Sequence, residues 1–253
     1  MSIAAEESTR LRPLVALQAL RALFRNGEDT KQVFIIADAL RGRTGLTAFE
    51  RFRRTALGRD VLAGKRSLLD VLNDRPRLAA LPDGALGRRY YDFMAEENLT
   101  ADGLVDASRA AGGDQTSREL RLFRERNRDQ HDLQHVTTGY GRDPLGEVCL
   151  LAFGYAQNGN RGIGFIAFMG MLKIARALPG QPVISAVRQA YRNGKAAARL
   201  FEQDWEALLP ESLDAVRRSL GIAEPTVYQG VIEAARSGKV ALRMPRPTAM
   251  AAE

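Results

Sequence analysis

The two histidines of this chain lie close together, in residues 131–135, His-Asp-Leu-Gln-His, and Glu147 follows the second by twelve positions. A neutral imidazole binds metal ions, and residues four apart share one face of a helix. His131 and His135 could therefore reach one ion, with Asp132 and Glu147 adding carboxylate oxygens. The single cysteine, Cys149, excludes a thiolate cluster, so a metal here must be held by nitrogen and oxygen.

The elements that must position these residues are two helices and a turn. The charged segment 117–138 predicts a long helix with both histidines in its last turns. The sequence Gly-Tyr-Gly-Arg-Asp-Pro at 139–144 predicts the end of this helix and the start of another. Asp143 would cap the second helix, and Pro144 would lie in its first turn. We therefore expect Glu147 to approach the histidine face across the turn. The alternative is a pair of histidines without a metal, near the negative end of a helix dipole.

Helical periodicity extends over nearly the whole chain, which predicts an all-α fold in a single multi-helix bundle. Residues 1–224 are expected to form this one domain. Among its helices we expect one continuous helix over 185–209. Residues 225–253 are expected to be a C-terminal extension, with a short helix at 229–237 and then a partly disordered tail.

One of the most apolar helices carries Phe165, Phe168, Met169 and Leu172 on one face. The small residues Gly164, Ala167 and Gly170 leave room along another face. Such a helix could line a channel for a long isoprenoid chain. The other interpretation is an ordinary buried core helix.

The net charge of +7 comes mainly from arginine, and it has two interpretations. An arginine-rich surface attracts phosphates, lipid headgroups or carboxylates. Alternatively, it reflects a compositional bias, because the arginines are scattered among acids and form no nucleic-acid-binding motif. No apolar stretch reaches the roughly 18 residues that span a bilayer, and the first twelve residues resemble no signal or transit peptide.

The motif H-D-x-x-H followed by eleven residues and Glu resembles the ubiquinone (coenzyme Q) biosynthesis family known as the fourth Coq protein. The resemblance extends upstream through Arg126-Asn127-Arg128-Asp129 and through residues 81–87 with Tyr90 and Phe93. Downstream it includes Gly146-Glu147, Gln157 and Trp205-Glu206. It covers the chain from the first helix to about residue 222.

The resemblance implies a divalent metal, zinc in the family, held by His131, Asp132, His135 and Glu147. This ligand set would also suit iron, manganese or cobalt. It further implies an apolar lipid cavity, for which we expect the face containing Phe165, Phe168, Met169 and Leu172. The implied activity is that of a carbon–carbon lyase, which replaces the carboxyl at ring carbon 1 of a polyprenyl hydroxybenzoate by hydroxyl. Arg126 or Arg128 could bind the departing carboxylate.

The expected partners are a polyprenyl phenol or quinone lipid and other ubiquinone-biosynthesis enzymes. A homodimer is compatible with the sequence, and we do not expect the protein to bind nucleic acid. We expect a bacterial cytoplasmic protein that is peripheral to the inner membrane. Two alternatives remain at this stage. One is a non-catalytic, metal-stabilised scaffold that binds polyprenyl lipid, and the other is a metal-dependent prenyl-phosphate hydrolase.

Overall fold

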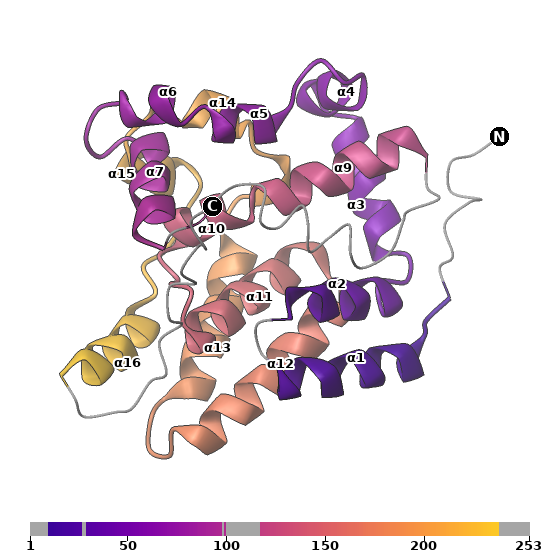
Figure 1. Ribbon diagram of the computed structural model, residues 1–253, viewed down its shortest axis with the longest axis vertical. Helices are drawn as coiled ribbons and strands as arrows, with labels where there is room; N and C mark the ends of the chain where they lie inside the picture. The colour runs from indigo at the N-terminus through magenta and orange to yellow at the C-terminus, as the bar shows by residue number, and fades with distance from the viewer. Residues whose placement is uncertain (1–9, 27–28, 98, 100–116, 238–253) are drawn as a thin grey trace, which may run out of the picture.

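The computed structural model describes residues 10–26, 29–97, 99 and 117–237, and within them the secondary structure is helical, with one isolated β-bridge between Ala85 and Ser212 (Figure 1). This confirms the predicted all-α class. The helices are α1 (Pro13–Arg25), α2 (Thr30–Ala39), α3 (Thr44–Arg53), α4 (Ala56–Leu62), α5 (Leu68–Asn73), α6 (Arg75–Ala79), α7 (Leu86–Glu96), α9 (Arg118–Asp129), α10 (His131–Thr138), α11 (Pro144–Asn158), α12 (Arg161–Ala177), α13 (Val183–Ala196), the 3₁₀-helix η2 (Leu200–Glu202), α14 (Trp205–Leu208), α15 (Leu213–Ser219) and α16 (Thr226–Arg236).

The largest core cluster surrounds α11, which packs against α13 on one side and α12 on the other (Figure 1). Fully buried side chains such as Leu145, Phe153 and Trp205 lie in it. A second cluster joins α1 and α2 to α12. A third joins α3 and α4 to α9, and in it Phe123 packs on Phe49 and Phe52 with ring centroids 5.6 and 5.4 Å apart. Burial of this apolar surface is the main stabilising contribution to the fold.

Small residues of α12 bring its neighbours into close contact. A Cβ added at Gly164 would lie 2.9 Å from the Tyr155 ring, and one at Gly170 would lie 2.6 Å from Val148. Ala167 is buried in the main core. The face that we expected to leave room is therefore in close contact with side chains of α11 at Gly164 and Gly170.

The predicted long helix over 117–138 is wrong, because the structure divides it at Gln130 into α9 and α10. Gln130 is fully buried, and its side-chain carbonyl accepts a hydrogen bond from the indole N–H of Trp205, 2.6 Å away. This partner is 75 positions further along the chain. The histidines thus belong to a short helix of their own, of which His131 is the first residue.

The predicted continuous helix over 185–209 is also wrong. α13 ends at Ala196, and the backbone is extended at Ala197 before η2 and α14 follow. The side chain of Gln157 holds this break, since it donates to the Ala198 carbonyl at 2.8 Å and accepts from the Leu200 N–H at 3.1 Å. Here a buried polar partner from α11 outweighs local helical propensity.

The C-terminal helix α16 starts three residues before the expected helix and contributes Tyr228, Val231 and Ile232 to the main core. The tail after it, predicted to be disordered, lies outside the described residues. Among the described helices, none combines the length and apolar character needed to cross a bilayer.

Candidate metal centre

The site is built on the turn between α10 and α11, and each end of that turn is capped. Arg217 of α15 donates to the carbonyls of Thr137 and Val136 at 2.9 and 3.1 Å, which satisfies the C-terminus of α10. Gly139 follows with a φ of 78°, a left-handed conformation that glycine adopts without strain. Asp143 then caps α11 through the N–H groups of residues 145 and 146, as its position before Pro144 predicts.

This turn brings Glu147 to the histidines, as expected. Its carboxylate lies 3.5 Å from Nε2 of His135 and 3.9 Å from Nε2 of His131. Asp132 approaches His131 from the other side, 3.3 Å from Nδ1. Single ligand atoms of His131, Asp132 and His135 all lie within 4.8 Å of one another, so this cluster could hold a metal ion.

The two rings have different surroundings. His135 is completely buried, and its Nδ1 lies 2.9 Å from the backbone carbonyl of Tyr140. That contact favours a proton on Nδ1 and leaves the lone pair on Nε2. Nε2 itself makes no hydrogen bond to any described residue. The Glu147 carboxylate at 3.5 Å can pair with Nε2 only when the ring is protonated, so the buried lone pair of the neutral ring has no donor, and an N/O metal site that includes Nε2 fits this observation.

The other side of the site is open. The side chains of His131 and Glu147 are each about one third exposed, at 33% and 34%. The pair of Nε2 atoms and the Glu147 carboxylate face one another, whereas Asp132 faces the far nitrogen of His131. Asp132 can therefore either bind the metal or hold the His131 ring in place, a role that carboxylates often have beside metal-bound histidines.

The charges within the cluster stabilise one another. Burial raises the pKa of the Glu147 and Asp132 carboxyls, but the neighbouring histidines and Arg142 outweigh burial, and both pKa values are lowered. Burial lowers the pKa of His135, but the charges of Glu147 and Asp132 outweigh it, and the pKa is raised. The two acids are thus held as carboxylates, which is the form that binds cations.

Two residues at this site were not expected from the motif. Phe93 of α7 stacks on the His135 ring with centroids 6.0 Å apart and an interplanar angle of 22°. Arg142, in the turn, adds positive charge near Asp132 and Glu147 and lies 3.6 Å from Glu97. Its place in the turn was visible in the sequence, but nothing there indicated that its charge would act on the cluster.

The structure places Arg126 and Arg128 in ion pairs. Arg126 is 3% exposed and forms a bidentate pair with Glu206, at 2.9 and 2.7 Å, as well as a bond to the Gln203 carbonyl. Arg128 pairs with the adjacent Asp129 at 2.7 Å. Both guanidinium groups therefore have acidic partners within the chain.

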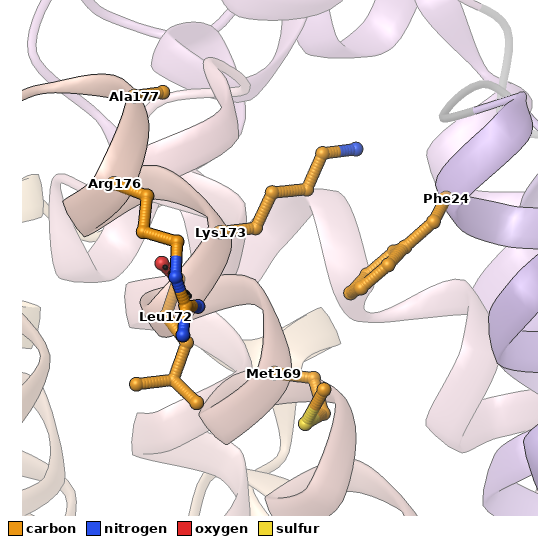
Figure 2. Close-up of a pocket in the computed structure, with 6 residues that line it drawn as sticks. All are labelled: Phe24, Met169, Leu172, Lys173, Arg176 and Ala177. Atoms are coloured by element: carbon orange, nitrogen blue, oxygen red, sulfur yellow. Dashed lines mark hydrogen bonds between the residues drawn. The ribbon is translucent and has the colours of Figure 1, made fainter.

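The residues expected to bind substrate are divided between different surroundings. Met169 and Leu172 line an open hollow of about 450 Å³ between α12 and Phe24 of α1, and Lys173 extends across it (Figure 2). The Lys173 ammonium lies 4.8 Å from the centroid of the Phe24 ring. Phe165 packs into the second cluster instead, and Phe168 is 52% exposed. The hollow is lined by Phe24, Met169, Leu172, Lys173, Arg176 and Ala177.

Comparison with known proteins identifies relatives of this chain. The family model described as coenzyme Q (ubiquinone) biosynthesis protein Coq4 matches residues 9–226. The chain is 29% identical over 224 residues to the mitochondrial COQ4 homologue of Danio rerio, with 87% of this chain and 79% of that protein covered. It is 26% identical over 215 residues to the corresponding protein of Homo sapiens, with 85% and 79% covered.

A solved structure shares the fold. A crystal structure of a chain from Nostoc punctiforme PCC 73102, described as a ubiquinone biosynthesis protein, superimposes with a TM-score of 0.61. That structure covers 85% of this chain and all of its own, at 21% sequence identity. From the extent of the family match, together with the histidine motif in its folded position, the chain belongs to the Coq4 family of ubiquinone biosynthesis proteins.

Proposed function

We propose that this protein acts in ubiquinone biosynthesis as a metal-dependent enzyme, and that it removes the carboxyl group of a polyprenyl hydroxybenzoate and puts a hydroxyl in its place. One observation carries this proposal above the others. Nε2 of His135 is buried without a hydrogen-bond partner in the described structure, and it faces the Glu147 carboxylate at the open side of the cluster. The site can therefore hold a cation and still be reached from outside.

The proposed reaction breaks the bond between ring carbon 1 and the carboxyl carbon, which leaves as carbon dioxide. A carbon–oxygen bond forms at the same ring carbon with an oxygen atom from water, and the two electrons and two protons released reduce an external oxidant, dioxygen, to hydrogen peroxide. A bound divalent metal would supply Lewis-acid polarisation of the phenolate or carboxylate. Zinc suits the ligand set and cannot accept electrons, whereas iron, manganese or cobalt could also take part in the redox step.

The chain's own contribution is to orient the ligands and to bind the anionic end of the substrate. His135, His131 and Glu147 would hold the metal, and Asp132 would either bind it or orient the His131 ring. Arg126 and Arg128 were the expected carboxylate-binding residues, and both have acidic partners. Arg142 also lies near an acid, Glu97 at 3.6 Å, but it is 30% exposed and its charge acts on the acids of the cluster, so we assign the substrate carboxylate to Arg142 first.

We further propose that the polyprenyl tail and a membrane surface meet the protein at α1 and α12. Leu14 is 75% exposed, and Leu17, Phe24 and Phe168 are exposed as well. Lys173 and Arg176 lie at the hollow in Figure 2, beside this apolar surface. Apolar side chains next to cations suit contact with an anionic bilayer. The fraction of protein that floats with anionic liposomes should fall as the salt concentration rises. At the same salt concentration, Leu14→Ser should float less than the unaltered protein.

A specific experiment separates this function from a scaffold role. Purified protein is loaded in turn with zinc, iron, manganese or cobalt and given a carboxylated polyprenyl phenol with oxygen, and in parallel a prenyl phosphate. We expect carbon dioxide release that disappears in His135→Ala and Glu147→Ala. Lipid binding without turnover under every metal would contradict the enzyme and favour a scaffold for other ubiquinone-biosynthesis enzymes. Release of phosphate would favour a prenyl-phosphate hydrolase.

A further inference from the structure

All but the first residue of helix α16 lies after the stretch that the family model matches, because that match ends at residue 226, where α16 begins. The helix is nevertheless firmly seated. Val231 is 1% exposed in the main core, and Gln189 of α13 bonds both the Thr226 hydroxyl and the Val227 N–H at 2.9 Å. This anchoring aims one side chain of α16, Tyr228, at the turn that carries the metal centre.

The hydroxyl of Tyr228 bridges two parts of that turn. It donates a hydrogen bond to one carboxylate oxygen of Asp143, and it accepts one from the N–H of Gly141 at 2.9 Å. Its ring also packs edge-on against Tyr140, with centroids 5.4 Å apart. Burial, together with the charge of Asp143, raises the pKa of Tyr228, so the hydroxyl keeps its proton and remains a donor.

Each of these two bonds leads to one proposed ligand. Gly141 follows Tyr140, whose carbonyl lies 2.9 Å from Nδ1 of His135, so the placement of this peptide controls the ring and its tautomer. Asp143 uses its other carboxylate oxygen to cap α11 at 3.0 Å, and its backbone carbonyl accepts from the Glu147 N–H at 3.0 Å. One hydroxyl on α16 therefore connects to both His135 and Glu147.

We infer that Tyr228 is a positioning residue of the metal centre: it locks the α10–α11 turn so that His135 presents Nε2, and Glu147 its carboxylate, to the same point. It touches neither the metal nor the substrate. The inference rests on the proposed metal site. It assigns α16, which lies after the matched stretch except for its first residue, a specific task at the site in addition to its contribution to the core.

The test uses the full chain with Tyr228→Phe, which keeps the ring and removes only the hydroxyl. The protein has two histidines, so ¹⁵N-histidine labelling gives a simple spectrum, which a His131→Gln variant assigns. In the metal-free protein at a pH where the ring is neutral, we expect His135 to carry its proton on Nδ1. In Tyr228→Phe we expect a mixture of tautomers or broadened signals, and a cobalt affinity weaker by about tenfold.

Val231→Ala is the matched control, since it loosens the same helix while the hydroxyl stays. It should lower the melting temperature and leave both the His135 tautomer and the cobalt affinity as in the unaltered chain. The inference is overturned if Tyr228→Phe keeps the original tautomer and affinity, or if Val231→Ala changes them equally. Failure of the unaltered chain to bind cobalt would refute the metal proposal instead, while the metal-free spectra would still decide the role of Tyr228.

Discussion

Trp205 donates its indole N–H to the side-chain carbonyl of Gln130 at 2.6 Å, and Gln130 is the residue immediately before His131. Both side chains are fully buried. The amide of Gln130 is further fixed by its bond to Asn127 at 2.9 Å. Gln130 lies between α9 and α10, so this contact holds the junction at which the histidine helix begins.

Trp205→Phe should therefore destabilise the protein through two effects. It removes the donor to Gln130 and leaves a buried acceptor unsatisfied, which costs about 1–3 kcal/mol, and the smaller ring leaves unfilled space in the core. Chemical denaturation measures the change in the free energy of unfolding. Gln130→Met replaces the acceptor by an apolar side chain, so no buried acceptor is left unsatisfied when Trp205 is also replaced. The double variant should therefore lose clearly less unfolding free energy than the sum of the losses in the two single variants.

Gly146→Ala should distort the turn between α10 and α11. A Cβ at this position would lie 2.1 Å from the carbonyl oxygen of Gly141, a backbone atom that cannot move without shifting the turn. We expect a loss of about 3 kcal/mol in unfolding free energy, together with weaker metal binding.

Gly154→Ala on the same helix is the control for that substitution. A Cβ there would meet nothing within 4 Å, and alanine favours the helix by up to about 1 kcal/mol. This variant should be as stable as the original or slightly more stable. Equal losses in Gly146→Ala and Gly154→Ala would show that the close approach to Gly141 has no consequence.

Arg126 and Arg142 should respond differently to replacement by glutamine. Arg126→Gln removes the buried partner of Glu206 and leaves it with Arg66 at 3.4 Å, so stability should fall by about 3 kcal/mol. Arg142 lies at the open side of the site, so Arg142→Gln should change stability little. It should lower kcat/KM for the carboxylated substrate about tenfold or more. Denaturation and steady-state kinetics measure the two effects. Unchanged turnover in Arg142→Gln would refute its assignment to the substrate carboxylate.

Asp204 should contribute a stabilisation that depends on pH. A bidentate bond from Arg66 is the largest cause that lowers the pKa of this carboxyl below its ordinary value of 3.8, and burial opposes it. A lowered pKa in the folded state means that the contribution is present above pH 3.8 and is lost as the pH falls further. Because the side chain is partly exposed, the contribution should stay below about 1 kcal/mol.

The measurement compares the original chain with Asp204→Asn from neutral pH down to pH 2.5. The difference in unfolding free energy should be constant at neutral pH and should shrink below pH 3.8. Asp83→Asn is the exposed control, and its difference should stay near zero throughout. A difference for Asp204→Asn that persists unchanged at the lowest pH would show that the ion pair with Arg66 is not its origin.

Local sequence determined the class of the fold and the parts of the candidate site. Helical periodicity predicts an all-α chain, and Asp143 with Pro144 predicts the start of α11, because capping depends on neighbouring residues. The spacing of His131, His135 and Glu147 then follows from a helix and a turn, and the structure brings their side chains together.

Tertiary structure decided what depends on distant partners. Gln130, at the junction of α9 and α10, bonds Trp205, and Gln157 bonds the backbone after Ala196. Tyr228 joins α16 to the turn between α10 and α11. The pairing of Arg126 with Glu206 spans 80 positions. Residues that far apart in sequence meet only after the helices pack. A buried polar group needs a hydrogen-bond partner, and the tertiary fold determines which residue provides it. Local periodicity therefore does not predict that partner.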